Sequence, residues 1–233
     1  GQTTVNGVIP STDDVIAEPT EAFTVNGTVT SGNTSNTAAS GTVTIEDNDA
    51  TPTMTIGSVT VNEGVGNATV PVSISGLSSV DTVINITTTT GTAGALDYTA
   101  VTTTVTIPAG QTTVNVVIPI TDDLIDEPNE KFTVNGTLVS GTIDAANSDF
   151  IGEVTIVDND ATPRVTIGDV TVNEGDGTAS VPVTLSVPSS VDTVIDIVTT
   201  TGTAGTSDYT ATTIQVTIPA GQTTVNVVIP ITD

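Results

Sequence analysis

Short segments of this chain alternate between apolar and polar residues, and turn-forming residues separate one segment from the next. The clearest segment is 113–121, where valine or isoleucine occupies every second position from Val114 to Ile120. A period of two places these side chains on one face of a β-strand. No segment shows the 3.6-residue period of an amphipathic helix, and Thr, Val and Ile are abundant. The pattern therefore predicts an all-β protein.

Between residues 53 and 157 the pattern predicts seven strands separated by turns, which is typical of a β-sandwich. The expected strands are residues 53–62, 68–75, 82–90, 102–108, 113–121, a segment that begins at Lys131, and 153–157. If seven strands reverse direction in turn, the unit begins and ends at opposite poles. Copies of such a unit can therefore stack end to end.

The whole pattern repeats with a period of about 110 residues, which indicates a domain copied in tandem rather than a short solenoid unit. GQTTVN begins at Gly1, Gly110 and Gly221, and DNDATP begins at Asp47 and Asp158. DNDATP joins two apolar segments through turn formers and a proline, so we place the domain junction there. Residues 1–51 are then the C-terminal part of one domain, 52–162 a complete domain, and 163–233 the N-terminal part of a third. We expect them to come from a longer continuous array.

The same count of strand directions gathers acidic residues at one pole of each domain. Three loops and the segment that leaves the last strand are expected there, and they carry Glu63, Asp97, the run 122–130 and the run 158–160. Carboxylates about 4 Å apart repel by roughly 1 kcal/mol in water and about 4 kcal/mol at an effective dielectric constant of 20. An acidic pole of this kind needs a counter-charge, unless it is simply a solvated face.

Composition limits what the counter-charge can be. The chain has two Lys or Arg residues against 27 Asp or Glu, a net charge of −25, and no His or Cys. Nucleic acid is excluded as a partner because phosphate binding needs clustered cations, and no apolar run approaches the ~20 residues of a membrane span, so we expect no membrane insertion. Calcium suits such loops because it accepts an irregular shell of about six to eight oxygens. Without His or Cys, zinc, copper and iron are disfavoured.

The same composition argues against an enzyme. Without His or Cys, the common nucleophile–base pairs are missing. Paired carboxylates can hydrolyse sugars, but three Phe and two Tyr offer few aromatic faces to a carbohydrate. We expect no catalytic activity.

Three segments carry a resemblance to a known family: GTAGALDYTA from Gly91, VTIPAGQTTVNVVIPITDDLIDEPNEKFTV from Val105, and VTIVDND from Val154. They are similar to the Calx-beta motif, a family of calcium-binding domains found in sodium–calcium exchangers, integrin subunits and large bacterial adhesins. The resemblance covers essentially the whole chain. It implies tandem immunoglobulin-like β-sandwiches of about seven strands, stacked end to end.

The resemblance also implies Ca2+ as the bound ion and a set of ligands carried over by position. In the complete repeat these are Glu63, Asp122, Asp123, the carbonyl of Ile125, Glu127, Glu130, Asp158 and Asp160. In the first copy they are Asp13, Asp14, Glu18, Glu21, Asp47 and Asp49, and in the third copy they are Glu174 and Asp233.

Two departures from the family pattern lower the expected number of ions. Thr90 and Thr201 stand where calcium-regulating members have Asp, and Asn48 and Asn159 interrupt the acidic run after the last strand. Asp97 and Asp208 keep two interpretations, because each could bind the ion or cap the turn that precedes it.

Near-identical tandem copies usually supply length and many weak contacts, so the sequence favours a structural filament of a giant cell-surface adhesin, stiffened by calcium near its junctions. It resembles the gliding-motility adhesins of Bacteroidota. We expect an extracellular location, with neighbouring repeats as partners, and surface polysaccharide or other surface proteins contacted through regions outside this segment. The alternatives are a calcium sensor, which would carry one or two diverged copies, and a carbohydrate-binding module.

Overall fold

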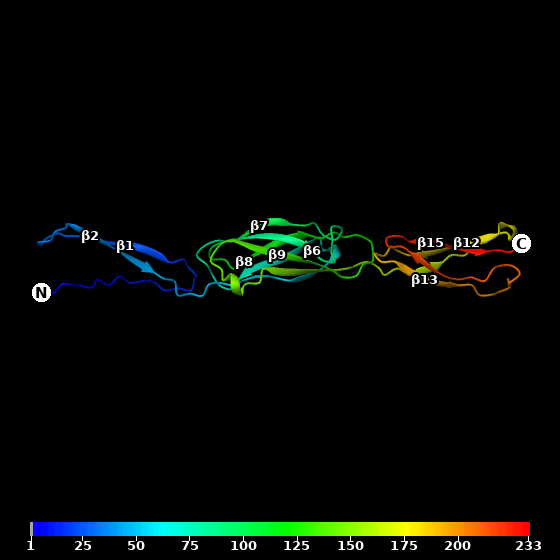
Figure 1. Cartoon of the computed structure of the whole chain (residues 1–233), viewed down its shortest axis with the longest axis horizontal. Coiled ribbons are helices and arrows are strands. Elements are labelled where there is room, and N and C mark those ends of the chain that lie inside the picture. Colours follow the sequence, from blue (N-terminus) through cyan, green and yellow to red (C-terminus); the bar gives the residue numbers. More distant parts are fainter. Residues whose placement is uncertain (1) are drawn as a thin grey trace.

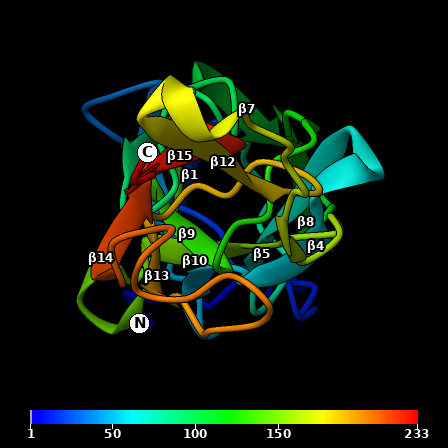
Figure 2. The same ribbon diagram turned by 90° about the vertical axis from the view of Figure 1, so that its right-hand side faces the viewer.

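The computed structural model describes residues 2–233, apart from the side chain of Asn147; Gly1, where the first expected segment begins, lies outside this range. The strands form three bodies in a row, with the two ends of the chain at opposite ends of the row (Figure 1). Figure 2 looks along the row, and the three bodies overlap in that view. The molecule is therefore an extended rod, as expected for units that begin and end at opposite poles.

The central body consists of two facing β-sheets. The first sheet has the strand order β4 (Val59–Asn62), β10 (Ile151–Val157), β9 (Glu130–Ser140), β6 (Thr82–Thr90) and β7 (Thr102–Ile107). The second sheet has the order β3 (Met54–Ile56), β5 (Asn67–Ile74) and β8 (Thr113–Pro119). Neighbouring strands are antiparallel except β4 and β10, which run parallel. The predicted β-sandwich is confirmed.

The helices of the described residues are three short 3-10 turns: η1 (Glu63–Val65), η2 (Ala145–Asn147) and η3 (Glu174–Asp176). None of them is long and apolar enough to cross a membrane. Of the three, η1 bears on function, because it carries an acidic residue into the pole where the loops after β6 and β8 also lie.

The expected strand 53–62 is wrong, because these residues form two strands in different sheets. β3 pairs with β5 in the second sheet, whereas β4 pairs with β10 in the first. The chain crosses between the sheets at Gly57, whose N–H donates to the Pro71 carbonyl at 2.8 Å. Apolar side chains lie at even positions before Gly57 and at odd positions after it. A phase change of one residue turns side chains to the opposite face, and the change of sheet returns them to the core.

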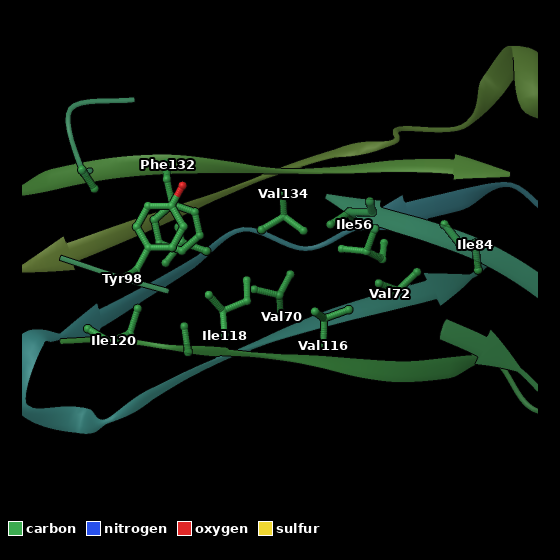
Figure 3. Packing of buried hydrophobic residues seen from close by; sticks show 14 of the residues in the cluster. Ile56, Val70, Val72, Ile84, Tyr98, Val116, Ile118, Ile120, Phe132 and Val134 are labelled. Carbon is green, nitrogen blue, oxygen red and sulfur yellow. The ribbon is translucent and has the colours of Figure 1, made fainter. Parts of the chain in front are cut away.

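The core of the central body lies between the two sheets. Tyr98 and Phe132 stack near the acidic end of this core, with ring centroids 3.8 Å apart (Figure 3). The alternation predicted for residues 113–121 is confirmed in β8, where Val116 and Ile118 are buried and Val117 is 55 % exposed. The core therefore holds the strands from which the acidic loops emerge.

The flanking bodies repeat parts of the central one. Before it lie β1 (Glu21–Thr28) and β2 (Ala38–Ile45), and after it lie β11 (Val165–Ile167), β12 (Thr178–Leu185), β13 (Thr193–Val198), β14 (Thr213–Ile218) and β15 (Thr224–Pro230). Matching core positions are more exposed there: Phe23, which corresponds to Phe132, is 37 % exposed. The expected domain boundaries 1–51, 52–162 and 163–233 stay a prediction.

We predict that Phe132→Ala destabilises the central body by about 3–5 kcal/mol, the usual effect of removing a fully buried aromatic side chain. Hydrogen exchange of the β6 and β9 amides measures this as a lower free energy of opening. The matched control is Phe23→Ala, which removes the corresponding ring where it is 37 % exposed. Its effect on β1 and β2 is expected to be much smaller. Equal losses in the two variants would contradict the assignment of Phe132 to the core.

Candidate metal centre

Four segments bring carboxylates to one pole of the central body: η1 after β4, the loops after β6 and β8, and the segment after β10. Among the described residues these carboxylates form two groups. Within each group, one oxygen from each member lies within 4.8 Å of the others. The Glu63 group contains Glu63, Asp123 and Asp160, and the Asp97 group contains Asp97, Glu127 and Glu130. Counting strand directions therefore placed these segments correctly.

The Glu63 group is held in place by main-chain hydrogen bonds. Glu63 is only 4 % exposed, and the Asp123 N–H donates to its carboxylate. Asp123 is oriented in turn by the Ile125 N–H, which donates to its Oδ1 at 2.7 Å. Asp160 comes from the segment that leaves β10. Three segments far apart in the sequence thus meet at one buried acid.

Asp97 caps the turn after β6 and also belongs to one of the two acidic groups, so the cap is observed and a role as a calcium ligand stays a prediction. Its Oδ2 accepts a hydrogen bond from the Gly94 N–H at 2.5 Å, which caps the turn after β6. Its carboxylate also lies beside Glu127 and Glu130, and Glu130 is hydrogen-bonded to it. Two carboxyl groups form such a bond only when they share a proton. The ligand set carried over from the family lacks Asp97, and its place in a loop of the acidic pole was the sequence signal for its membership of this group.

Two carboxylate oxygens at this pole are buried without a hydrogen-bond partner among the described residues. They are Asp158 Oδ1 and Asp160 Oδ2. Buried polar atoms without partners carry an uncompensated cost of desolvation, which a bound cation would relieve at these two oxygens. Asp122 differs, since its Oδ1 accepts a hydrogen bond from the Asn159 amide at 3.4 Å. The role of the Ile125 carbonyl stays a prediction.

The pKa values at the pole are raised. Burial raises the pKa of Glu63 from 4.5 to about 7, and the Asp123 carboxylate adds to the shift. Desolvation and the hydrogen bond to Asp97 raise the pKa of Glu130 to about 7. Desolvation and neighbouring carboxylates also raise the pKa values of Glu127 and Asp160. Burial and neighbouring like charges both favour the protonated form of these carboxyl groups, so a bound cation would compete with protons for them.

Among the described residues, no lysine or arginine forms an ion pair with these groups. In residues 2–233 the only ion pair within 4.0 Å joins Lys131 Nζ to Glu153 at 2.7 Å. The donors at the pole are oxygens, with no His or Cys in the chain. Hard divalent cations prefer such donors, and calcium accepts the irregular geometry of loops. The residues present therefore fit calcium, and the two acidic groups are the places that would hold it.

The first copy repeats some of these hydrogen bonds, although its acids form no such group among the described residues. The Asn48 amide donates to Asp13 Oδ1 at 3.3 Å, as Asn159 does to Asp122. The Ile16 N–H donates to Asp14 Oδ1 at 2.8 Å, as Ile125 does to Asp123. Desolvation and nearby carboxylates raise the pKa values of Glu18 and Asp49. Asp47 acts on both of them, and Glu21 acts on Glu18.

The third copy contributes two of the expected ligands. Glu174 and Asp233 are exposed and belong to no acidic group among the described residues. Asp208 caps its turn, since its Oδ2 accepts a hydrogen bond from the Gly205 N–H at 2.7 Å. The ligand set as a whole stays a prediction.

Comparison with known proteins identifies a family whose model matches most of the chain. The model of the Calx-beta domain matches residues 47–160 and 158–233. Among solved structures, the chain is similar to the crystal structure of CBD12 from CALX1.2 (20 % identity, TM-score 0.42, covering 77 % of this chain and 75 % of that one). It is also similar to the calcium binding domain CBD12 of CALX1.1 (21 % identity, TM-score 0.43, 77 % and 76 %) and to the apo-form Calx CBD1 domain (25 % identity, TM-score 0.43, 48 % and 100 %). No curated protein matches the chain.

The raised pKa values predict that the metal-free central body loses stability as the pH rises. Glu63 and Glu130 keep protons in the folded state at pH values where the unfolded chain has released them, so stability is fully present below about pH 4.5 and falls until about pH 7. For Glu63 the shift corresponds to about 3 kcal/mol, at about 1.4 kcal/mol per unit. Denaturant unfolding in chelator between pH 4.5 and 8 measures it.

The control for this pH dependence is Glu63→Gln, which keeps the shape and the acceptor oxygen of the side chain but cannot ionise. We expect a shallower decline in this variant than in the unmodified chain. Stability that is constant or rises with pH would contradict the raised pKa values, and so would identical slopes in the two proteins.

Proposed function

The chain belongs to the Calx-beta domain family, and from this premise we propose that its repeats bind calcium at the acidic pole and form a structural, calcium-stiffened part of a long cell-surface filament. The observation that carries the proposal is the pair of acidic groups, together with the buried, unpartnered carboxylate oxygens of Asp158 and Asp160. Calcium binding would satisfy those oxygens and relieve the repulsion between the carboxylates.

The position of the site supports a mechanical role. Asp158 and Asp160 lie in the segment 158–164, which links β10 of the central body to β11 of the next. An ion held between Asp160 and the other members of its group would fasten the start of this linker to η1 and to the loop after β8. Fewer conformations of the linker would then remain, and the rod would bend less.

The repeated architecture supports a filament. Each body joins the next end to end, and such a head-to-tail arrangement extends without closing on itself. We propose an extracellular location, where millimolar calcium is enough to fill weak sites with dissociation constants on the order of 10⁻⁴ to 10⁻³ M. The filament would serve adhesion or surface motility, with neighbouring repeats as its direct partners and polysaccharide or other surface proteins bound elsewhere.

Calcium titration of the whole chain, followed by binding heat and by X-ray scattering, tests this function. We expect saturable binding together with a longer maximum dimension than in chelator, because the linkers lose conformations. Magnesium should act more weakly, since it requires stricter octahedral geometry. No binding at millimolar calcium would overturn the proposal. Binding without any change in dimension would favour a sensor or a purely stabilising ion.

Removing one carboxylate from the Glu63 group should weaken calcium binding. We expect Asp160→Asn to raise the dissociation constant of the central site about tenfold or more, because affinity depends on the charge of the ligands. Asp169→Asn is the matched control, since it removes an exposed carboxylate in the third body that belongs to neither acidic group. Similar affinities in the two variants would show that bound calcium does not depend on the Glu63 group.

A further inference from the structure

The central body and the body after it touch through main-chain hydrogen bonds. The Asp126 N–H donates to the Pro188 carbonyl at 3.2 Å, and the Ser190 N–H donates to the Asp126 carbonyl at 3.0 Å. Asp126 and Ser189 thereby form a parallel β-bridge. Asp126 belongs to the acidic run 122–130, which follows β8 and ends on the first residue of β9 and is called here the acidic loop. Pro188, Ser189 and Ser190 form the turn after β12, called here the Ser-Ser turn of that body.

The same contact occurs between the first body and the central one. The Ala17 N–H donates to the Leu77 carbonyl at 3.0 Å, and the Ser79 N–H donates to the Ala17 carbonyl at 3.1 Å. Ala17 and Ser78 form the parallel bridge. Alanine stands here where the other junction has Asp126, so the contact depends on the main chain of the acidic loop and not on its side chain. The serines occupy the receiving turn in both cases.

The Ser-Ser turn is buried and is held in place by hydrogen bonds from its own body. Ser78 and Ser189 are 1 % and 4 % exposed. Their carbonyls are held from within their own bodies by the N–H groups of Gly110 and Gly221, at 2.9 and 2.8 Å. At the second junction the hydroxyls of Ser189 and Ser190 also donate to the Asp126 carbonyl, each at 3.4 Å. One carbonyl of the acidic loop thus receives three hydrogen bonds from the next body.

The docked residue lies between members of the two acidic groups. Asp123, three residues before it, belongs to the Glu63 group, and Glu127, directly after it, belongs to the Asp97 group. The stretch of main chain that carries both carboxylates is therefore the stretch held by the next body. Any order that a ligand brings to this loop reaches the junction without an intervening element.

We propose that the Ser-Ser turn of each repeat is a docking element for the acidic loop of the preceding repeat, and that this contact converts order in the loop into stiffness of the rod. The docking stands on the hydrogen bonds alone, whereas the conversion rests on the proposed calcium function. A body attached only by the linker 158–164 can swing about it in any direction, and a second attachment at Asp126 removes most of that freedom. Because binding free energies are reciprocal, docking should also raise the calcium affinity of the loop.

The test is Ser190→Pro, which removes the N–H that donates to the Asp126 carbonyl. Its matched control is Ser79→Pro, the same change in the same turn of the central body, which acts on the junction away from the central acidic groups. X-ray scattering gives the maximum dimension of each chain in chelator and in calcium. The Gly64 amide resonance follows the central site during a calcium titration, since Gly64 lies beside Asp122 and Asn159.

We expect both variants to be shorter than the unmodified chain in chelator. Only Ser190→Pro should weaken the central site, by about fivefold or more, the lower end of usual coupling between sites. An unchanged dimension for Ser190→Pro overturns the docking, and a shorter rod with unchanged affinity overturns the coupling. If no chain binds calcium, the proposed function fails while the dimension in chelator still tests the docking.

A second variant covers the case in which proline disturbs the third body, which the amide resonances of β12 and β15 would reveal. Replacing both Ser189 and Ser190 with alanine removes the hydroxyl hydrogen bonds to Asp126 and keeps the main chain. It should shorten the rod in the same direction but less. An unchanged dimension in this variant would overturn the role of the serines.

Discussion

At the acidic pole of the central body, six carboxylates from four segments lie in two groups, each with oxygens within 4.8 Å of one another. Carboxylates at this distance cannot all stay ionised without a large rise in free energy, so protons or a cation must compensate. Protonation is the first of these, since the pKa values of Glu63 and Glu130 are both raised to about 7. A cation is the second, since the carboxylate oxygens, including the unpartnered ones of Asp158 and Asp160, could bind it.

The arrangement of the strands couples this local problem to the shape of the whole chain. Because β10 runs parallel to β4, the chain leaves the central body at the pole where η1 also lies. Asp158 and Asp160, which follow β10, therefore also begin the linker to the next body. The acidic loop adds the second connection, through Asp126 and the Ser-Ser turn. The acidic groups, the linker and the contact between the bodies therefore lie next to one another at the same pole.

Much of this was predictable from the sequence. The alternating pattern predicted the strand 82–90 with its observed bounds and the buried face of β8. The count of strand directions predicted that Glu63 and Asp123 lie at the same pole. The switch of sheet at Gly57 was not predicted, because both halves of 53–62 alternate well and only the change of phase between them signals the crossing. Asp97 was left open because capping and ligation use the same carboxylate. The docking at Asp126 involves main-chain atoms of two bodies, which side-chain patterns do not report.

Anomalous X-ray scattering from crystals of the chain grown with calcium tests the central claim most directly, because it locates the ion itself. The account predicts anomalous peaks in the central body at about 2.3–2.6 Å from carboxylate oxygens of the Glu63 group and of the Asp97 group. Crystals grown in chelator should lack them. Acidic groups without a peak at millimolar calcium, in crystals that preserve the pole as described, would contradict the account.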